Sequence, residues 1–221
     1  MTKIIILPFL CLFASLSAAP TREAFALEER AITGVPTDAF ELGDSNLTIE
    51  LWARSPMIYS PVAMDFDAQG RLWTTEGIDY QRGRRIAEGR SIIVLEDKDW
   101  DGKADTSTIF VTEKEIRHAA LGIAVFDNQI VLSSTPSIIV YTDVNRNAVF
   151  DEGVDKREVF LTGFRDASHD HTLHAVVGAP SGQWHFSYGN RGADITTKDG
   201  RHHISGCYYG YSDGIGKKSS D

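Results

Sequence analysis

SIIVLED at residues 91–97 recurs as SIIVYTD at residues 137–143, which is 46 residues further along the chain. Each copy is a run of β-branched and other apolar residues that leads into an acidic loop, and a second apolar run follows at residues 108–111 and 158–161. Short apolar runs bounded by turn residues are typical of β-strands. Because the pattern recurs, the sequence predicts a repeat architecture.

A second family of repeats precedes these units. Residues 62–73, 122–132 and 173–186 each read as a strand, a tight turn and a strand. Two hairpins per unit, recurring every 45 to 60 residues, predict an all-β fold, and within it a β-propeller of four-stranded blades with about three blades present. An unrelated all-β domain with similar hairpins is the alternative.

The number of units predicts an incomplete propeller. Closed propellers typically have 4–8 blades, and an open one exposes two sheet edges. We therefore expect residues 47–221 to form part of a longer propeller. The polar, Gly-rich stretch at residues 208–221 is expected to finish no strand.

The N-terminus has the pattern of a secretory signal peptide. Lys3 precedes an apolar run at residues 4–16, and small residues follow up to Ala19. We expect residues 1–19 to be the signal peptide, residues 20–46 to be a linker or N-terminal extension, and the protein to be exported to the periplasm or the extracellular space.

Composition excludes several partners. The chain has 22 basic and 31 acidic residues, a formal charge of −9, and no Lys/Arg cluster, which argues against nucleic acid and anionic membrane surfaces. No segment after the signal peptide approaches the roughly 20 apolar residues of a transmembrane helix. Without the signal peptide Cys207 is the single cysteine, so we expect no internal disulfide.

The first acidic loop, residues 97–105, alternates carboxylates with other residues. Asp97, Asp99, Asp101 and Asp105 occupy its positions 1, 3, 5 and 9, and Gly102 supplies the bend. Ca²⁺ prefers 6–8 oxygen ligands, which such a loop directs at one centre. The sequence therefore predicts a calcium site, and a solvated acidic turn is the alternative.

The second acidic loop begins at Asp143 and keeps the spacing with Asn145, Asn147 and Asp151. Ala148 replaces the glycine, and two of the four ligands are neutral. Because affinity for Ca²⁺ falls with ligand charge, we expect a weaker calcium site here.

A histidine-rich motif precedes the third hairpin. In His169-Asp170-His171, a histidine next to a carboxylate suggests a general base with an orienting partner, because imidazole titrates near neutral pH. Such a base can take the proton of a hydroxyl group as hydride leaves the same carbon. The alternatives are a hydrogen-bonded structural histidine and chelation of a metal by His169 and His171.

Four motifs carry a family resemblance: the first acidic loop, Leu161-Thr162-Gly163-Phe164, His169-Asp170-His171 and Ser187-Tyr188-Gly189-Asn190. Together they resemble the membrane-bound dehydrogenase propellers of planctomycete and verrucomicrobial type, which are related to soluble pyrroloquinoline-quinone-dependent glucose and sorbosone dehydrogenases. The likeness extends over residues 51–221.

The resemblance implies a function. His171 would be the catalytic base and Asp170 its orienting partner, in an oxidoreductase that uses pyrroloquinoline quinone (PQQ) held by Ca²⁺ to oxidise a sugar or another alcohol. An electron acceptor such as a cytochrome would be its partner. The alternative is a non-catalytic propeller, stabilised by Ca²⁺, that binds a glycan or a protein partner.

Overall fold

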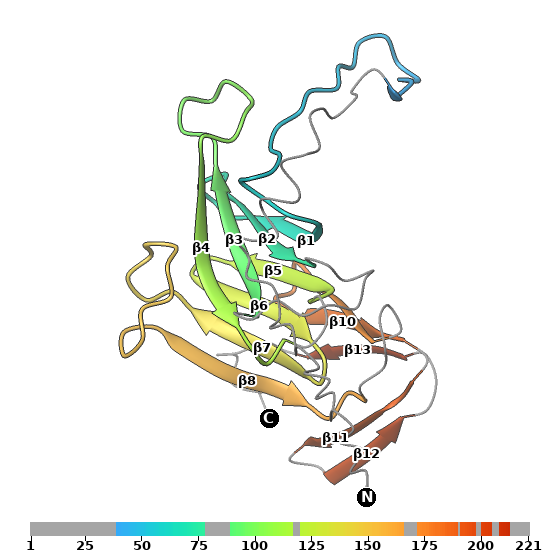
Figure 1. The fold of residues 1–221 in the computed structure, drawn as a ribbon. Helices are drawn as coiled ribbons and strands as arrows, with labels where there is room; N and C mark the ends of the chain where they lie inside the picture. Colours follow the sequence, from blue (N-terminus) through green and yellow to red (C-terminus); the bar gives the residue numbers. More distant parts are fainter. Residues whose placement is uncertain are drawn as a thin grey trace, which may run out of the picture.

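The computed structural model contains only strands as regular elements within the residues that it describes (Figure 1). These residues are 39–77, 89–116, 120–165, 172–189, 191–197, 200–204 and 208–212. Their strands are β1 (Pro61–Phe66), β2 (Leu72–Glu76), β3 (Arg90–Glu96), β4 (Thr106–Glu113), β5 (Gly122–Phe126), β6 (Gln129–Ser134), β7 (Ser137–Thr142), β8 (Lys156–Thr162), β9 (Leu173–Gly178), β10 (Trp184–Tyr188), β11 (Ala193–Thr197), β12 (Gly200–Ile204) and β13 (Tyr208–Ser212).

The strands form antiparallel sheets whose neighbours follow the order of the chain. The first sheet has the order β1-β2-β3-β4 and the second has the order β5-β6-β7-β8. The predicted hairpins are therefore confirmed, as are the all-β fold and the four-stranded unit of a propeller-like arrangement. The two sheets (Figure 1) pack against each other, because residues of both contribute to one buried apolar cluster.

The repeated apolar runs form β3 and β7, each the third strand of its sheet. Alternate side chains of a strand point to opposite faces of the sheet. Ile92 and Val94 pack against the second sheet, whereas Ile93 and Leu95 face the chain segment 52–58. The strand is thus buried on both faces, which explains why its sequence is continuously apolar rather than alternating.

β7 is buried in the same way between two neighbours. Ile139 and Tyr141 pack toward the first sheet, and Ile138 and Val140 pack toward the third. Burying an aliphatic side chain of this size contributes about 1.5–3 kcal/mol to folding. These central strands therefore hold the stack of sheets together.

The third sheet has the order β13-β10-β9. β11 and β12 form a separate hairpin between β10 and β13 in the chain, and an isolated bridge joins Phe164 to Ala193. The expectation that residues 208–221 finish no strand is wrong, because Tyr208–Ser212 pairs along the whole of β10. Three of the five residues of β13 are tyrosines, which favour strands, and its main-chain hydrogen bonds to β10 complete the sheet.

The first strands of consecutive sheets lie side by side and run in the same direction. At the starts of β5 and β9, a Cβ atom placed on Gly122 would lie 2.6 Å from the Cα atom of Ala175. At their ends, a Cβ atom on Gly178 would overlap the ring of Phe126. Glycine at both positions permits this close approach, so the two strands are neighbours in different sheets, as in adjoining blades.

β1 and β5 are related similarly. The backbone N–H of Val125 donates to Oδ2 of Asp65 at 2.8 Å, and the Thr75 hydroxyl donates to the Ala120 carbonyl at 2.8 Å. These two bonds connect the first sheet to the second, one near the end of β5 and the other just before its start.

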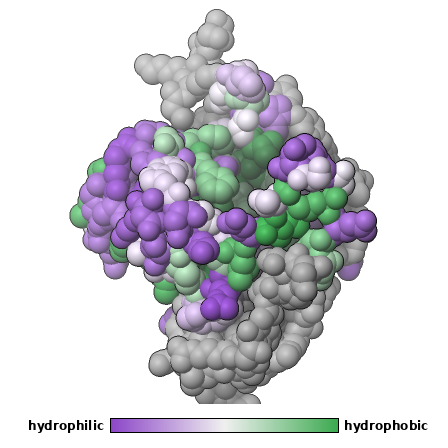
Figure 2. Space-filling view, turned by 90° about the horizontal axis from the view of Figure 1, so that it is seen from above, coloured by the Kyte–Doolittle hydropathy of each residue, from purple (hydrophilic) through white to green (hydrophobic). Residues whose placement is uncertain are grey.

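One face of the first strand is not covered by the described residues. Val62, Met64 and Phe66 alternate along β1 and are exposed, Met64 to 68%. Figure 2 shows polar and apolar areas side by side on the described surface. None of the described segments is a helix that is long and apolar enough to cross a membrane.

Candidate functional site

The first acidic loop connects β3 to β4 and brings carboxylates together. One oxygen each from Asp97, Asp99 and Asp105 lie within 4.8 Å of one another. Asp101, the fourth predicted ligand, does not join this group, and its Oδ1 instead accepts the backbone N–H of Lys103 at 2.9 Å. The structure therefore brings together three of the four predicted ligands.

Backbone hydrogen bonds set the shape of this loop. The N–H of Gly102 donates to Oδ2 of Asp97 at 2.9 Å, and the N–H of Lys98 donates to Oδ2 of Asp105 at 2.6 Å. Trp100 and Gly102 have positive φ values of 61° and 87°, which close the turn. The N–H of Asp101 likewise donates to Oδ1 of Asp99 at 3.2 Å, so each of the three carboxylates uses one oxygen within the loop and keeps the other for a ligand.

Asp97 provides a test of whether a cation fits. Its Oδ1 is a buried atom that has no hydrogen-bond partner among the described residues. Burying a carboxylate oxygen without a partner is costly, and a cation coordinated by that oxygen would remove the cost. Three converging carboxylates with one orphaned oxygen match the ligand chemistry of Ca²⁺, a hard cation that binds oxygen.

The second acidic loop connects β7 to β8, and its carboxylates accept hydrogen bonds from other residues of the same loop. Asp143 accepts the backbone N–H of Asn147 at 3.2 Å and that of Ala148 at 2.9 Å. The side-chain amides of Asn145 and Asn147 each donate to Oδ2 of Asp151 at 2.7 Å. These two bonds lower the pKa of Asp151 below its ordinary value.

This arrangement differs from the first loop in its chemistry. In the second loop, amide N–H groups converge on Asp151, where the first loop presents carboxylate oxygens. The described carboxylates of the second loop do not form a group like that of Asp97, Asp99 and Asp105. The geometry therefore favours the first loop as the stronger cation site.

Asp155 is a structural residue of the second loop that spacing alone missed. Its Oδ1 accepts the N–H of Val144 at 2.8 Å and its Oδ2 accepts the N–H of Asp151 at 2.7 Å. Asp105 binds the N–H of Lys98 in the same manner, so Asp155, rather than Asp151, has the backbone role of Asp105. The signal was present in the sequence, because Asp105 and Asp155 each directly precede the following strand.

The predicted catalytic residues Asp170 and His171, together with His169, lie outside the described residues. The chain that follows them is held firmly: Thr172 is buried, and the N–H of Leu173 donates to the Thr135 hydroxyl at 3.1 Å. The motif therefore directly precedes, in the sequence, the anchored start of the inner strand β9.

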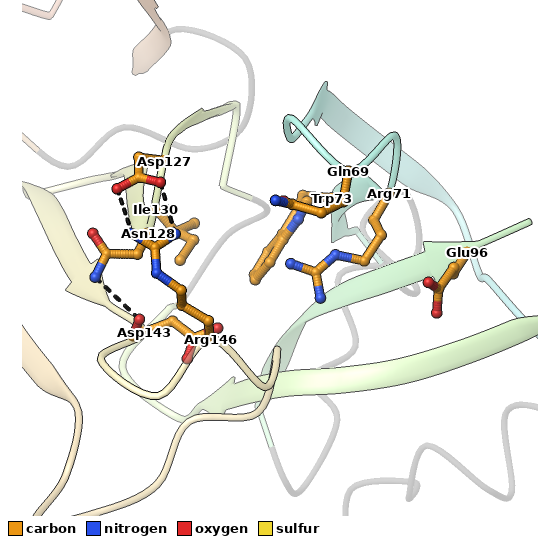
Figure 3. Close-up of a pocket in the computed structure, with 9 residues that line it drawn as sticks. All are labelled: Gln69, Arg71, Trp73, Glu96, Asp127, Asn128, Ile130, Asp143 and Arg146. Carbon is orange, nitrogen blue, oxygen red and sulfur yellow. Dashed lines mark hydrogen bonds and ion pairs between the residues drawn. The ribbon is translucent and has the colours of Figure 1, made fainter. Parts of the chain in front are cut away.

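A pocket, here named the inter-sheet pocket, opens between the first two sheets on the side of the acidic loops (Figure 3). It has a volume of about 180 Å³. Its walls come from the β1–β2 turn, β2, the end of β3, the β5–β6 hairpin and the second acidic loop, and they consist of Gln69, Arg71, Trp73, Glu96, Asp127, Asn128, Ile130, Asp143 and Arg146.

Asp67 positions one wall of this pocket from behind. Its Oδ2 accepts hydrogen bonds from Arg71 Nε at 2.7 Å and from Trp73 Nε1 at 2.8 Å. Burial alone would raise the pKa of Asp67, but the hydrogen bonds from Trp73 and Arg71 lower it below its ordinary value. Asp67 is therefore a charged anchor, and the guanidinium group of Arg71 lies over the Trp73 ring at 5.7 Å from its centroid.

Two arginines and three carboxylates face the pocket, and most of them are paired. Arg146 binds Asp127 through two hydrogen bonds of 2.7 and 2.6 Å. On the same wall, the side-chain amide of Asn128 donates to the Asp143 carbonyl at 3.1 Å. The pocket was not predicted from the sequence, because its walls come together only through the stacking of the sheets.

Comparison with known proteins gives one strong match. A family model described as "Domain of unknown function (DUF7133)" matches residues 38–217. No curated protein matches the chain. An iodide structure of Trichoderma reesei Carbohydrate-Active Enzymes Family AA12 is 14% identical with a TM-score of 0.42, over 62% of this chain and 31% of that one.

A calcium structure of the same Trichoderma reesei family is 12% identical with a TM-score of 0.37, over 58% of this chain and 29% of that one. The aligned part of the chain thus spans less than a third of the length of either neighbour. The family match covers most of the sequence, and the chain therefore belongs to the DUF7133 family.

Proposed function

We propose that this protein is a Ca²⁺-binding, propeller-like part of an exported oxidoreductase that oxidises a sugar or another alcohol. The observation that carries the proposal is the first acidic loop, where three carboxylates converge and Asp97 Oδ1 is buried with no partner in the part of the chain that the structure describes. That donor set suits Ca²⁺. The ion would fasten β3 to β4 at the edge of the first sheet.

The oxidoreductase part of the proposal rests on the resemblance of His169-Asp170-His171 to the Asp-His pair of the quinone-dependent dehydrogenases. His171 would accept the proton of the substrate hydroxyl group, and Asp170 would orient the imidazole ring. The position of the motif in the sequence supports this assignment, because it directly precedes β9, an inner strand.

PQQ, when bound, would accept the hydride. It enters the proposal through the resemblance alone, and no described residue is assigned to hold it. An electron acceptor such as a cytochrome would then reoxidise the cofactor. Export to the periplasm or the extracellular space follows from the signal-peptide pattern of residues 1–19.

Turnover by the His171→Ala variant tests the catalytic assignment. The natural full-length protein would be supplied with PQQ, Ca²⁺ and an artificial electron acceptor, and sugars and alcohols would be screened for acceptor reduction. We expect His171→Ala to lose activity by about 10²–10⁴-fold, the usual contribution of a general base. His202→Ala, in an exposed residue of β12, is the matched control and should remain active.

Unchanged turnover in His171→Ala would show that this histidine is not the base. A protein that binds Ca²⁺ yet oxidises none of the screened alcohols would favour the alternative, a non-catalytic propeller that binds a glycan or a protein partner.

A further inference from the structure

We propose that the inter-sheet pocket binds one ring of a neutral sugar through pairs of hydroxyl groups. The inference goes beyond the proposed function, because the pocket contains none of the residues assigned to catalysis. Its support is the size of the pocket, the fixed orientation of Arg71, and the balance of charge on the pocket walls.

The volume of the inter-sheet pocket limits the size of its ligand. Pockets for drug-sized molecules measure roughly 300–1,000 Å³, whereas this one measures about 180 Å³. A single six-membered ring with its hydroxyl groups therefore suits this pocket better than a drug-sized molecule does.

Arg71 is the most strongly oriented donor in the pocket. Asp67 holds its Nε and its backbone N–H at 2.7 and 2.9 Å, and only 19% of the Arg71 side chain is exposed. Figure 3 shows its two terminal nitrogens directed into the pocket. Within the described residues no hydrogen bond uses these two nitrogens, so a planar pair of donors is available to a ligand.

Acceptors come from both sides of the pocket. Glu96 lies on the same side as Arg71, at the end of β3, with 43% of its side chain exposed and an ion pair to Lys98 at 3.9 Å. Asp127 faces the pocket from the β5–β6 hairpin. Carboxylate oxygens accept hydrogen bonds from hydroxyl groups, whose own oxygens can in turn accept from a guanidinium group.

Charge balance selects a neutral ligand over an anion. The charge of Arg71 is compensated by Asp67, and that of Arg146 by Asp127. The walls carry three carboxylates, those of Glu96, Asp127 and Asp143, against the two arginines, and this excess of negative charge would repel a carboxylate or a phosphate. Hydroxyl groups carry no charge and are both donors and acceptors, so they match a wall that alternates guanidinium and carboxylate groups.

Calorimetric titration of the full chain with two sugars tests the inference. The probes are D-glucose, which is neutral, and D-glucuronate, which is anionic. We expect saturable binding of glucose, with glucuronate about tenfold weaker because of the excess of carboxylates on the pocket walls. Glucuronate binding more tightly than glucose would overturn the neutral-ligand assignment, as would the absence of saturable glucose binding.

Two variants locate the binding. Arg71→Lys keeps the charge but removes the planar pair of donors, and Glu96→Gln removes an exposed carboxylate with little consequence for packing. Each should weaken glucose binding about tenfold. Arg201→Lys, in an exposed residue of β12, is the control and should bind as the wild type does.

Glucose binding that is unaffected by both Arg71→Lys and Glu96→Gln would place the sugar elsewhere and overturn the inference. Because these experiments measure binding and the His171→Ala experiment measures turnover, failure of the pocket assignment and failure of the proposed function are distinguishable.

Discussion

The hydroxyl group of Tyr141 donates a 2.5 Å hydrogen bond to Oε1 of Glu113 across the interface between the first and second sheets. Arg157 completes the contact, because its Nε donates to the same carboxylate oxygen at 2.6 Å. Tyr141 is fully buried and its ring packs edge-on against Phe110 at 5.8 Å. A polar network thus closes the edge of the apolar cluster between two blades.

Removing this hydroxyl group should weaken the interface. Tyr141→Phe keeps the ring and its packing but leaves Glu113 with one donor fewer. We expect the free energy of unfolding to fall by about 1–3 kcal/mol, as for a hydrogen bond to a charged group. Chemical denaturation followed by fluorescence measures it, and an unfolding midpoint identical to that of the wild type would contradict the role given to this bond.

The same contact makes stability depend on alkaline pH. Burial first and the Glu113 carboxylate second raise the pKa of Tyr141 above its ordinary value of about 10. The folded chain therefore holds this proton more tightly than the unfolded chain does, so the stabilisation is complete below about pH 10 and is lost as pH rises toward the raised pKa. The wild type should lose more stability than Tyr141→Phe between pH 9 and 11, and parallel losses would contradict the prediction.

Gly122 tests the side-by-side placement of β5 and β9. Gly122→Ala would put a Cβ atom 2.6 Å from the Cα atom of Ala175, and a backbone atom cannot turn aside as a side chain can. We expect a loss of about 1–3 kcal/mol, as for other overpacked sites. Gly43→Ala is the control, since nothing lies within 4 Å of its Cβ position. Equal thermal midpoints of the two variants would mean that the strands are not in contact.

Matched variants can distinguish the contributions of Asp155 and Asp151 to the stability of the second acidic loop. Asp155 is buried and accepts two backbone N–H bonds, whereas Asp151 accepts two exposed side-chain amides. Asp155→Asn should lower the free energy of unfolding by about 1–3 kcal/mol, because one backbone N–H would meet an amide donor. Asp151→Asn should change it little. A larger effect of Asp151→Asn in thermal unfolding would reverse the roles given to the two residues.

The sequence predicted the parts of the fold whose physical cause is local. The runs at residues 91–97 and 137–143 were identifiable as strands because burial on both faces makes a strand continuously apolar. β13 was missed although Tyr208, Tyr209 and Tyr211 favour strands, because its partner β10 is distant in the sequence and its place is set by that pairing. The β11–β12 hairpin went unpredicted because its sequence is mostly polar.

In the candidate site, too, the features with a local cause were predicted and those that depend on packing were not. Alternating carboxylates predicted the first acidic loop, and Asp97, Asp99 and Asp105 do converge. Asp155 was missed, because the second loop is four residues longer than the first and counting positions pointed to Asp151 instead. The inter-sheet pocket could not be predicted, since Arg71 and Arg146 are distant in the sequence and meet only through the packing of two sheets.

Calcium titration of the chelator-treated full chain tests the central claim most directly. Calorimetry should show saturable Ca²⁺ binding that Asp97→Asn weakens about tenfold or more, because affinity follows the charge and number of oxygen ligands. Asp194→Asn, which alters a carboxylate on β11 outside both loops, should bind as the wild type does. A chain that binds no Ca²⁺, or one whose tightest site is untouched by Asp97→Asn, would contradict the assignment of a calcium site to the first acidic loop.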